Sequence, residues 1–589
     1  MQIYNAPLKD MQFLLETFGY NERINSMDAF KDFDLETLMM LMEQSAKFCS
    51  ERMLPLNRVG DVEGVKYNPE THEVTTPEGF KKLYQEAVEQ GSVGLTFPEE
   101  YGGVGAPHLA GVLLSEMATA TNKSFSMVTG LSHGLLDALL AHGSEEQKQR
   151  FAPLLTSGKW SGTMCLTEPQ CGTDLGMLTT KAEPKDDHYL LTGTKIWITF
   201  GEHDLAENIV HLVLARLPDA PEGIKGISLF LVPKFDFDGT RNPIYCTGLE
   251  HKMGIHASPT CVMSLEGAKG WLVGEPHKGM RAMFTMMNAA RLLVGIEGVS
   301  LADISYQTAL EFAKDRRQSR SLDKSKRDPD AAADCIMVHP DVRRMLLNVK
   351  SLVEGMRGLA YWTGFYLDIS HHHADEDTRA EADDIVALMT PIIKSFMTEK
   401  GFDAISEAMQ VCGGAGYTTD WSIEQYMRDS RIALIYEGTN GIQALDLIGR
   451  KLPRGNGRLF MRFNQLITDF IKANKEDERM AEFLNPLKDA SKKLGAATMG
   501  LSMKGMQDPE EAAAVASPFL NLFGYTAVAY VWCLQVRAAL DRESEGAFYA
   551  TKLKTARYYF QNILPQINAL VPIIEAGKAN LMDLDISEF

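Results

Sequence analysis

One glutamate stands at the end of an apolar run and directly before a glycine-rich turn. Residues 432–436 read Ile-Ala-Leu-Ile-Tyr, and Glu437 follows them, ahead of Gly438-Thr439-Asn440-Gly441. Burial beside apolar side chains disfavours a charged carboxylate, so we expect the pKa of Glu437 to be raised toward neutrality. A carboxylate of that kind suits a general base near pH 7. A glutamate at a loop edge that faces water fits the same stretch equally well.

Length, composition and charge limit the class of protein. The chain has 589 residues, of which 45% are hydrophobic and 23% charged. These values predict a globular protein of two to four domains. The formal charge of −19 repels the phosphates of nucleic acids, so we expect no nucleic-acid binding. A phosphate-bearing ligand would need a local basic site.

The cysteines and the first residues bear on compartment and metal content. The eight cysteines include no C-x-x-C pair, so we predict neither a zinc site nor a disulfide framework, and no metal. Residues 1–5, Met-Gln-Ile-Tyr-Asn, lack the basic and apolar regions of a secretory signal peptide. We therefore expect a cytoplasmic protein with reduced cysteines.

Residues 1–160 have the apolar spacing of helices. Apolar side chains recur every three or four residues in 35–49 and in 80–87. Residues 111–121 and 135–142 are apolar enough for buried helices, and Ser144 precedes an acidic first turn. This part of the chain is predicted to be a helical N-terminal domain.

The spacing changes to that of strands in residues 161–278. Segments 195–200, 209–215, 226–232 and 260–265 are rich in β-branched and aromatic residues and are separated by turn residues. No helical stretch intervenes and no G-x-G-x-x-G occurs, which argues against a Rossmann fold and an NAD-linked enzyme. We predict a central antiparallel β domain.

Helical spacing returns in residues 279–452. Long apolar stripes cover 342–360 and 385–409, and opposed apolar faces of long helices favour a bundle. The charged segment 317–334 is predicted to be an exposed loop, because its charges are of both signs.

A further helical region is predicted in residues 453–589, after a Pro-Arg-Gly-Asn-Gly linker at 453–457. Its most apolar stretch, 519–534, is shorter than the roughly 20 residues of a membrane span. A buried helix is favoured over peripheral membrane contact, and no stable membrane insertion is expected. The whole chain is thus predicted to be an α+β protein.

Four further stretches, read together with the turn at Glu437, resemble the acyl-CoA dehydrogenase family of flavoproteins. The order and spacing of the pieces carry the resemblance, which spans about residues 40–450. They are Met164-Cys165-Leu166-Thr167-Glu168-Pro169-Gln170-Cys171-Gly172-Thr173-Asp174, Trp197-Ile198-Thr199, Asp315-Arg316-Arg317-Gln318, and Gln410-Val411-Cys412-Gly413-Gly414-Ala415-Gly416-Tyr417.

The resemblance implies a fold, a cofactor and a reaction. It implies a helical N-terminal domain, a β domain and a four-helix bundle, with FAD between the last two. Glu437 matches the family's catalytic base, which removes the α-proton of an acyl-CoA thioester while a hydride leaves Cβ for the flavin. The product is a trans-2-enoyl-CoA, and an electron-transfer flavoprotein accepts the electrons.

The resemblance also implies residues that bind the ligands. Arg316 matches a cation that reaches the FAD pyrophosphate of a partner subunit, and Arg291 matches a substrate-side arginine. Without the family, Trp197 reads as a core residue and Arg316 as a solvated helix end. The implied cofactor residues are Met164, Leu166, Thr167, Gly172, Thr173, Trp197, Ile198, Thr199, Arg316, Gln410, Gly413, Gly414 and Thr439, and the implied substrate residues are Thr173, Asn288, Arg291 and Gly438.

The chain departs from the compact members of the family at several points. Ser319 stands where many relatives have an aromatic residue, and Asn440-Gly441 replaces the more usual Ser-Gln. With the long charged loop and the tail beyond 452, these features resemble a long bacterial branch. That branch includes 3-methylmercaptopropionyl-CoA and long-chain fatty acyl-CoA dehydrogenases. The added helices could cover a tetramer face, so we expect a homodimer.

Two other activities stay open at this stage. One is a flavin-bearing relative of the alkylation-response type, with little dehydrogenation and with nucleic-acid binding; the negative charge and Glu437 count against it. The other is a flavin oxidase or nitroalkane-type enzyme of the same fold, which would release peroxide in air. Acyl chain length, and a methylthio against an alkyl chain, cannot be told apart from the sequence.

Overall fold

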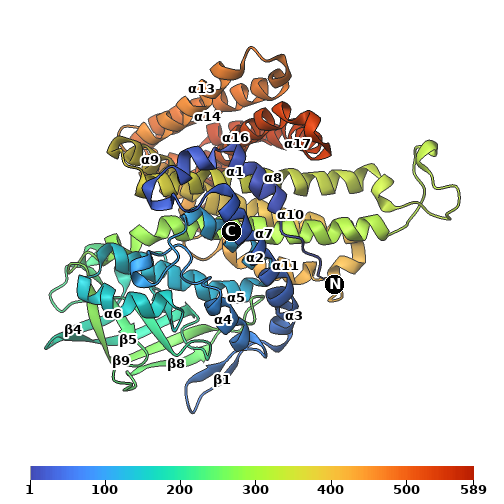
Figure 1. Cartoon of the computed structure of the whole chain (residues 1–589). Coiled ribbons are helices and arrows are strands. Elements are labelled where there is room, and N and C mark those ends of the chain that lie inside the picture. The colour runs from blue at the N-terminus through green and yellow to red at the C-terminus, as the bar shows by residue number, and fades with distance from the viewer. Residues whose placement is uncertain (1) are drawn as a thin grey trace. The chain divides into compact units, whose positions relative to one another are not determined.

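The structure, a computed structural model, describes residues 2–589, and the side chains of 285–289 lie outside the description. The chain forms two compact units (Figure 1). One comprises the residues before Gln44 together with Arg291–Phe589, and the other comprises Gln44–Ala290. The first helix of the chain therefore belongs with the C-terminal helices.

Helices open the unit formed by Gln44–Ala290. The expected helices at 80–87 and after Ser144 are confirmed, and Ser144 and Gln147 form a reciprocal capping box. The two helices expected at 111–121 and 135–142 are one long helix, interrupted at Asn122, where φ is −160° and ψ is 84°. The helices are α2 (Leu35–Phe48, which begins in the other unit), α3 (Leu54–Glu63), α4 (Phe80–Glu89), α5 (His108–His142) and α6 (Glu145–Thr156).

A seven-stranded sheet forms the rest of this unit. Its strands are β3 (Trp160–Cys165), β4 (Lys181–Lys185), β5 (His188–Thr199), β6 (Asn208–Arg216), β7 (Ile227–Pro233), β8 (Ile244–Leu249) and β9 (Thr260–Val273), while β1 (Lys66–Asn68) and β2 (Glu73–Thr75) form a separate hairpin. The β domain is confirmed, but the sheet is mixed where an antiparallel one was expected. β3 pairs with β6 in parallel, because no hairpin joins them: β4 and β5 lie between the two strands in the chain.

The pairings around β6 close the sheet on itself. β6 pairs with β7, β7 with β9, β9 with β5, β5 with β4, and β4 again with β6. Both faces of β6 are covered. Val210, Leu212 and Leu214 pack in one cluster with Leu135 and other residues of α5, and Val213 and Ala215 pack in a second cluster inside the sheet. A strand buried on both faces reads as a continuous apolar run, which is how residues 209–215 read.

The other unit is helical. Helix α8 packs against α9, α10 and α16. Lys552 of α17 forms ion pairs with Asp10 of α1 (2.6 Å) and with Glu354 of α8 (2.7 Å), which ties the first helix to this unit. Its helices are α1 (Leu8–Thr17), α7 (Gly279–Asp315, from Arg291 on), α8 (Pro340–His372), α9 (Glu376–Ile392), α10 (Thr398–Cys412), α11 (Ile423–Ser430), α12 (Asn440–Asp446), α13 (Arg458–Asn474), α14 (Ala481–Gln507), α15 (Pro509–Ala514), α16 (Ala516–Asp541), α17 (Ala547–Tyr558), α18 (Ile567–Ala576) and α19 (Ala579–Met582).

Two glycines let α7 and α10 approach closely. A Cβ on Gly298 would lie 2.3 Å from the Met397 carbonyl oxygen, and one on Gly401 would lie 2.5 Å from the Gly298 carbonyl oxygen. No side chain larger than hydrogen fits at this crossing. The crossing brings the part of α7 that follows Arg291 beside the middle of the α9–α10 helix.

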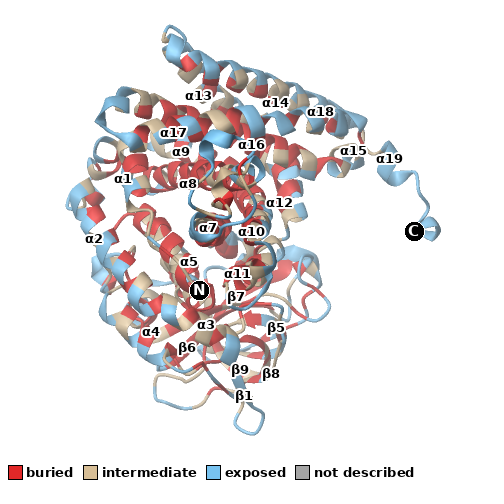
Figure 2. Cartoon of the chain, turned by 90° about the vertical axis from the view of Figure 1, so that its right-hand side faces the viewer, coloured by how far each residue is buried: buried red, intermediate tan, exposed pale blue. Residues whose placement is uncertain are grey.

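The apolar stretch 519–534 lies inside α16, as expected of a buried helix. The helix runs over 26 residues and has the length and composition of a membrane span, but 89% of its most apolar window is buried within the protein. Figure 2 shows α16 in the colour of buried residues over most of its length. It is the one such helix among the described residues, and its burial identifies it as a core helix.

Candidate active site

Glu437 sits in a tight turn between a short 3₁₀ helix, Arg431–Leu434, and α12. The backbone of Glu437 is left-handed, with φ of 56°, and that of Gly438 has φ of 83°. Left-handed backbone is unfavourable for a residue with a Cβ, and such strain is concentrated at functional sites. Thr439 ends the turn by accepting a hydrogen bond from the Ile442 N–H (3.3 Å), which caps α12.

The side chain of Gln443 holds this turn from α12. Its amide nitrogen donates to the carbonyl oxygens of Glu437 (3.2 Å) and Gly438 (3.1 Å). Gln443 is fully buried, so these bonds form away from solvent. The backbone from which the Glu437 side chain extends is therefore held by Gln443.

Three charged side chains of the same unit act on Glu437. Desolvation raises the pKa of Glu437, the positive charges of Arg291 and Lys394 oppose that rise, and the negative charge of Glu297 adds to it. The net direction is upward, as the sequence predicted. Arg291 and Lys394 are themselves buried, with 5% and 0% of their surface exposed. The carboxylate thus shares a poorly hydrated region with two cations.

Arg291 is held by a carboxylate of α12. Its Nη1 lies 3.1 Å from Oδ2 of Asp446, and the other oxygen of Asp446 pairs with Arg450 Nε at 2.6 Å. Desolvation lowers the pKa of Arg291 although Asp446 and Glu437 raise it. Among the described residues, the buried Arg291 Nε has no hydrogen-bond partner. One donor of this guanidinium is therefore available to another group.

Tyr436, the residue before Glu437, bonds to α7. Its hydroxyl donates to the carboxylate of Glu297, at 2.5 Å from Oε1. Burial and the negative charge of Glu297 raise the pKa of Tyr436, so its hydroxyl keeps its proton. This bond fixes the chain on the N-terminal side of Glu437 as Gln443 fixes it on the C-terminal side.

The predicted cofactor residues of the β domain gather where β3 ends and β5 bulges. Met164 lies in β3, and the Thr167 carbonyl oxygen accepts a hydrogen bond from the Ile196 N–H (2.9 Å), next to Trp197. The register of β5 against β9 shifts between Lys195 and Ile198. Within this group Gly172 and Thr173 are exposed, Leu166, Thr167 and Thr199 are half-buried, and Ile198 is buried in the sheet core.

Trp197 does not behave as a core residue. Its backbone is left-handed, with φ of 59°, and 60% of its surface is exposed. Such exposure is unusual for a tryptophan in a strand, since most of the large apolar residues of this sheet are buried. The bulge in β5 is the local feature that turns this side chain out of the sheet.

Glu168 has a structural part in the same loop. It forms a fully buried ion pair with Lys195 (2.9 Å) and accepts hydrogen bonds from the backbone and hydroxyl groups of Thr179 and Thr180. Burial alone would raise the pKa of Glu168, but Lys195 and these donors lower it to about 2. Lys195 also donates to the Leu166 carbonyl oxygen (3.0 Å). The pair thereby fixes the backbone that the sequence assigns to the flavin.

The remaining predicted residues lie apart from Glu437 along the helical unit. Arg316 follows the last turn of α7, Gln410 lies in α10, and Gly413 and Gly414 form the turn after it, with Gly413 at φ of 58°. All four are exposed. The structure brings Arg291, Gly438 and Thr439 to Glu437 but not these four. Asn288 lies outside the residues whose side chains are described.

Sequence reasoning missed the residues that hold the base. Lys394, Gln443 and Glu297 were not predicted, and Asn440 was noted only as a departure from the more usual serine. One signal could have found Lys394: it is a cation in the apolar run 385–397 of a predicted core helix. Burial of a lysine is rare without a partner. Gln443 carries no comparable signal, because a polar residue in a short helix is ordinary.

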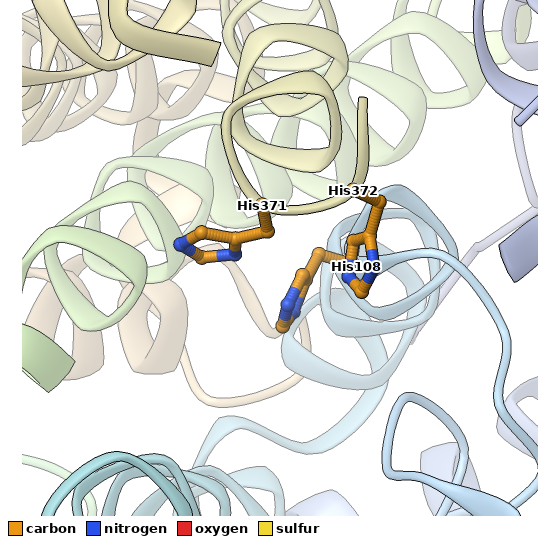
Figure 3. Close-up of side chains that lie close together, drawn as sticks. All are labelled: His108, His371 and His372. Carbon is orange, nitrogen blue, oxygen red and sulfur yellow. The ribbon is translucent and has the colours of Figure 1, made fainter. Parts of the chain in front are cut away.

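Three histidines lie outside this site. Figure 3 draws His371 and His372 at the end of α8, and His108 at the start of α5. His371 and His372 are consecutive and exposed. None of the three is among the charged groups named above that act on Glu437.

Family models match nearly the whole chain. The acyl-CoA dehydrogenase N-terminal, middle and C-terminal domain models match residues 36–159, 163–268 and 277–452, and a model described as acetyl-CoA dehydrogenase C-terminal like matches 463–585. A helical domain, a β domain and a helical domain that carries a half-buried glutamate in a strained turn define an oxidoreductase of this architecture. The chain belongs to the acyl-CoA dehydrogenase family.

Individual relatives are similar in sequence to this chain over nearly its full length. A 3-methylmercaptopropionyl-CoA dehydrogenase of Ruegeria pomeroyi is 41% identical over 96% of this chain and 97% of its own. A broad-specificity linear acyl-CoA dehydrogenase of Mycobacterium tuberculosis is 33% identical over the whole of both chains. The structure of an acyl-CoA dehydrogenase of Bacillus anthracis complexed with FAD superposes with a TM-score of 0.75 at 24% identity, covering 94% of this chain and 90% of that one. This last likeness concerns the fold.

Proposed function

We propose that this protein is an FAD-dependent acyl-CoA dehydrogenase in which Glu437 is the catalytic base. The observation that carries the proposal is the setting of Glu437: a carboxylate with a raised pKa, in a left-handed turn, on which the charges of two buried cations act. Removal of a weakly acidic α-proton needs a stronger base than a hydrated carboxylate, and desolvation supplies one. The proposed reaction converts an acyl-CoA to its trans-2-enoyl-CoA.

The residues of the β domain fit a flavin. Trp197 presents an exposed ring, and beside it the ends of β3 and β5 carry half-buried Thr167 and Thr199. Together they offer a flat surface with polar groups at its edge, which suits an isoalloxazine ring. Gly172 and Thr173 are exposed and open to a phosphate-bearing ligand. FAD, when bound, would accept the hydride from Cβ.

The chain's own residues handle the proton. Glu437 would take the α-proton on its carboxylate, while Gln443 and the Tyr436–Glu297 bond keep the turn in place. Arg291, whose Nε donor has no partner among the side chains that the structure describes, is proposed to face the substrate, as the family resemblance implies. The thioester oxygen would be held by backbone N–H groups of this turn, and Gly438 would allow the close approach.

The substrate proposal stays at the level of an acyl-CoA. The relatives are named for 3-methylmercaptopropionyl-CoA and for linear acyl-CoAs, and a thioether and a methylene are similar in size. We further propose that an electron-transfer flavoprotein accepts the electrons. The protein is proposed to be a homodimer, with residues 463–585 covering the face that would otherwise build a tetramer. A solution mass equal to four chains would reject the dimer.

The test is anaerobic bleaching of the flavin by acyl-CoAs of increasing length and by 3-methylmercaptopropionyl-CoA. We expect wild type to bleach, Glu437→Gln not to bleach, and Glu476→Gln, whose side chain is 87% exposed, to match wild type. The acyl-CoA that bleaches fastest identifies the substrate. Absence of bleaching with every acyl-CoA would favour the alkylation-response type of relative, and fast release of peroxide in air would favour an oxidase.

A further inference from the structure

The long helix that begins as α9 changes its winding where it passes the base. Between α9 and α10 the residues Ile393–Met397 form a π-helix, directly after Pro391 in the last turn of α9. Single π turns inside α-helices are frequent at functional sites. Here the π turn contains Lys394 and Ser395.

Asn440, the first residue of α12, docks into this π turn. Its side-chain nitrogen donates to the Ser395 carbonyl oxygen (3.1 Å), and its side-chain oxygen accepts from the ammonium group of Lys394 (3.0 Å). The Thr398 hydroxyl lies within hydrogen-bond distance of both atoms of the Asn440 amide, at 3.2 and 3.3 Å. Asn440 is two residues from Gly438 and three from Glu437, so it connects the turn of the base to the π segment.

Lys394 is the charge that this connection places near the base. Its side chain is fully buried, and a buried ammonium is costly unless an opposite charge lies nearby. Its ammonium group donates a hydrogen bond of 3.0 Å to the side-chain oxygen of Asn440, which orients it. The positive charge of Lys394 acts on Glu437 together with that of Arg291, which Asp446 pairs with directly.

We propose that Lys394 is a positioning residue for this enzyme: held by Asn440, its ammonium group keeps Glu437 as a carboxylate, ready to take the α-proton. The inference rests on the proposed role of Glu437 and goes beyond it by assigning the group that controls the state of the base. Lys394 does not touch the reacting atoms in this proposal. It acts through the charge that it presents to Glu437.

Other charged groups also influence the pKa of Glu437, and the variants that test Lys394 must leave them unchanged. Arg291 and Glu297 on α7 act on Glu437 together with Lys394, and desolvation is the largest influence. Asp446 and Arg450 act through Arg291. Since the charge of Lys394 lowers the pKa of Glu437, removing it raises that pKa further. A larger share of the base is then protonated, and inactive, at a given pH below the new value.

The first measurement titrates Glu437 itself. Infrared spectra of the protein without substrate are recorded against pH, and the protonated carboxyl band of Glu437 is identified by its loss in Glu437→Gln. We expect Lys394→Met to shift the midpoint of this band upward by about one to three pH units, the usual effect of a nearby opposite charge. Lys394→Arg, which keeps the charge, should stay near wild type. An unchanged midpoint in Lys394→Met would overturn the proposal.

A matched control and a second variant separate charge from folding. Lys400→Met removes another lysine of the same helix, which pairs with Glu399 (3.0 Å) and Asp403 (3.1 Å), and should leave the midpoint unchanged. Asn440→Leu keeps Lys394 but removes the group that orients it, and should shift the midpoint upward by less than Lys394→Met. If Lys394→Met does not fold, the Asn440→Leu variant provides the test. A midpoint equal to that of wild type in Asn440→Leu would then reject the proposal that Lys394, held by Asn440, controls Glu437.

The second measurement follows anaerobic flavin reduction by an acyl-CoA against pH. The acid limb of the profile should move upward in Lys394→Met by the same amount as the infrared midpoint, with about a tenfold loss of rate per unit at low pH. If the acid limb of the pH profile is the same in Lys394→Met as in wild type, the proposal is rejected. A wild type that no acyl-CoA reduces would reject the proposed function instead, while the infrared titration would still decide the role of Lys394.

Discussion

The side-chain amide of Gln443 donates a hydrogen bond of 3.2 Å to the main-chain carbonyl of Glu437. A second bond from the same nitrogen, to the Gly438 carbonyl oxygen, spans the turn. A residue in left-handed conformation relaxes to the β or α region unless its surroundings hold it. In this turn Gln443 holds the backbone, so the position of the Glu437 carboxylate depends on a residue six positions later in the chain.

Replacement of Gln443 by leucine tests this dependence. Gln443→Leu has a similar volume but no donor, so the turn can relax and the carboxylate moves away from its working position. We expect flavin reduction at saturating substrate to slow by about 10- to 100-fold, the typical effect of a displacement near 1 Å. Rapid-reaction absorbance at the flavin band measures the rate. Gln465→Leu, a change of an exposed glutamine on α13, should leave it unchanged, and an equal rate in both variants would contradict the role of Gln443.

Gly438 is required by conformation and by space. Its φ of 83° is unfavourable for any residue with a Cβ, and a Cβ at this position would lie 2.7 Å from Nε2 of Gln443. We expect Gly438→Ala to lower the free energy of unfolding by about 1–2 kcal/mol, the cost of left-handed backbone. Denaturant unfolding measures the change. Gly441→Ala, where the nearest atom would be 4.0 Å from the new Cβ, should cost nothing; a loss of equal size there would refute the explanation.

Sequence patterns predicted the elements better than the bonds between them. The apolar residues spaced along 80–87 and 342–360 correctly predicted α4 and α8, because the spacing of apolar residues in the sequence shows which face of a helix is buried. The parallel pairing of β3 with β6 and the merging of two helices into α5 depend on contacts between distant segments, which spacing does not encode. A pairing direction needs the path of the chain as well as the pattern.

The same limit applies to the site. The raised pKa of Glu437 followed from its apolar neighbours in sequence, and that direction agrees with the structure. The exposure of Trp197 was implied by the family resemblance alone, since its own strand context favoured a core position. The bonds of Asn440 to the π segment arise from side-chain geometry across 45 residues of chain. No local sequence pattern predicts such a contact.

Stability at low pH should depend on Glu168. Its pKa is lowered to about 2 in the fold, so its ionisation stabilises the fold fully above the ordinary value of 4.5. That contribution is lost as the pH falls from about 4.5 toward about 2. We expect Glu168→Gln to cost about 3–5 kcal/mol at pH 7, because Lys195 is left buried and unpaired. The deficit against wild type should shrink between pH 4.5 and pH 2.

Thermal unfolding at several pH values measures this effect. Glu183→Gln changes an exposed glutamate of β4 and should unfold as wild type does. The double variant Glu168→Gln/Lys195→Met removes both charges and should recover part of the loss, because no buried ion remains without a partner. A Glu168→Gln protein as stable as wild type at pH 7 would show that the pair contributes nothing.

Trp197 should have opposite effects on stability and on cofactor binding. Its left-handed backbone is strained for a residue with a Cβ, and its exposed ring contributes little to the core. We expect Trp197→Gly to raise the free energy of unfolding of the apoprotein by about 1 kcal/mol, because glycine adopts this conformation at low cost. FAD should bind about 3- to 10-fold more weakly, since ring stacking is worth about 0.5–1.5 kcal/mol.

Trp197→Ala should weaken FAD binding equally without the gain in stability, and Met177→Ala, at another exposed apolar residue of the same unit, should change neither. Titration of apoprotein with FAD and denaturant unfolding give the two quantities, and wild-type affinity in Trp197→Gly would remove the ring from the proposed flavin site.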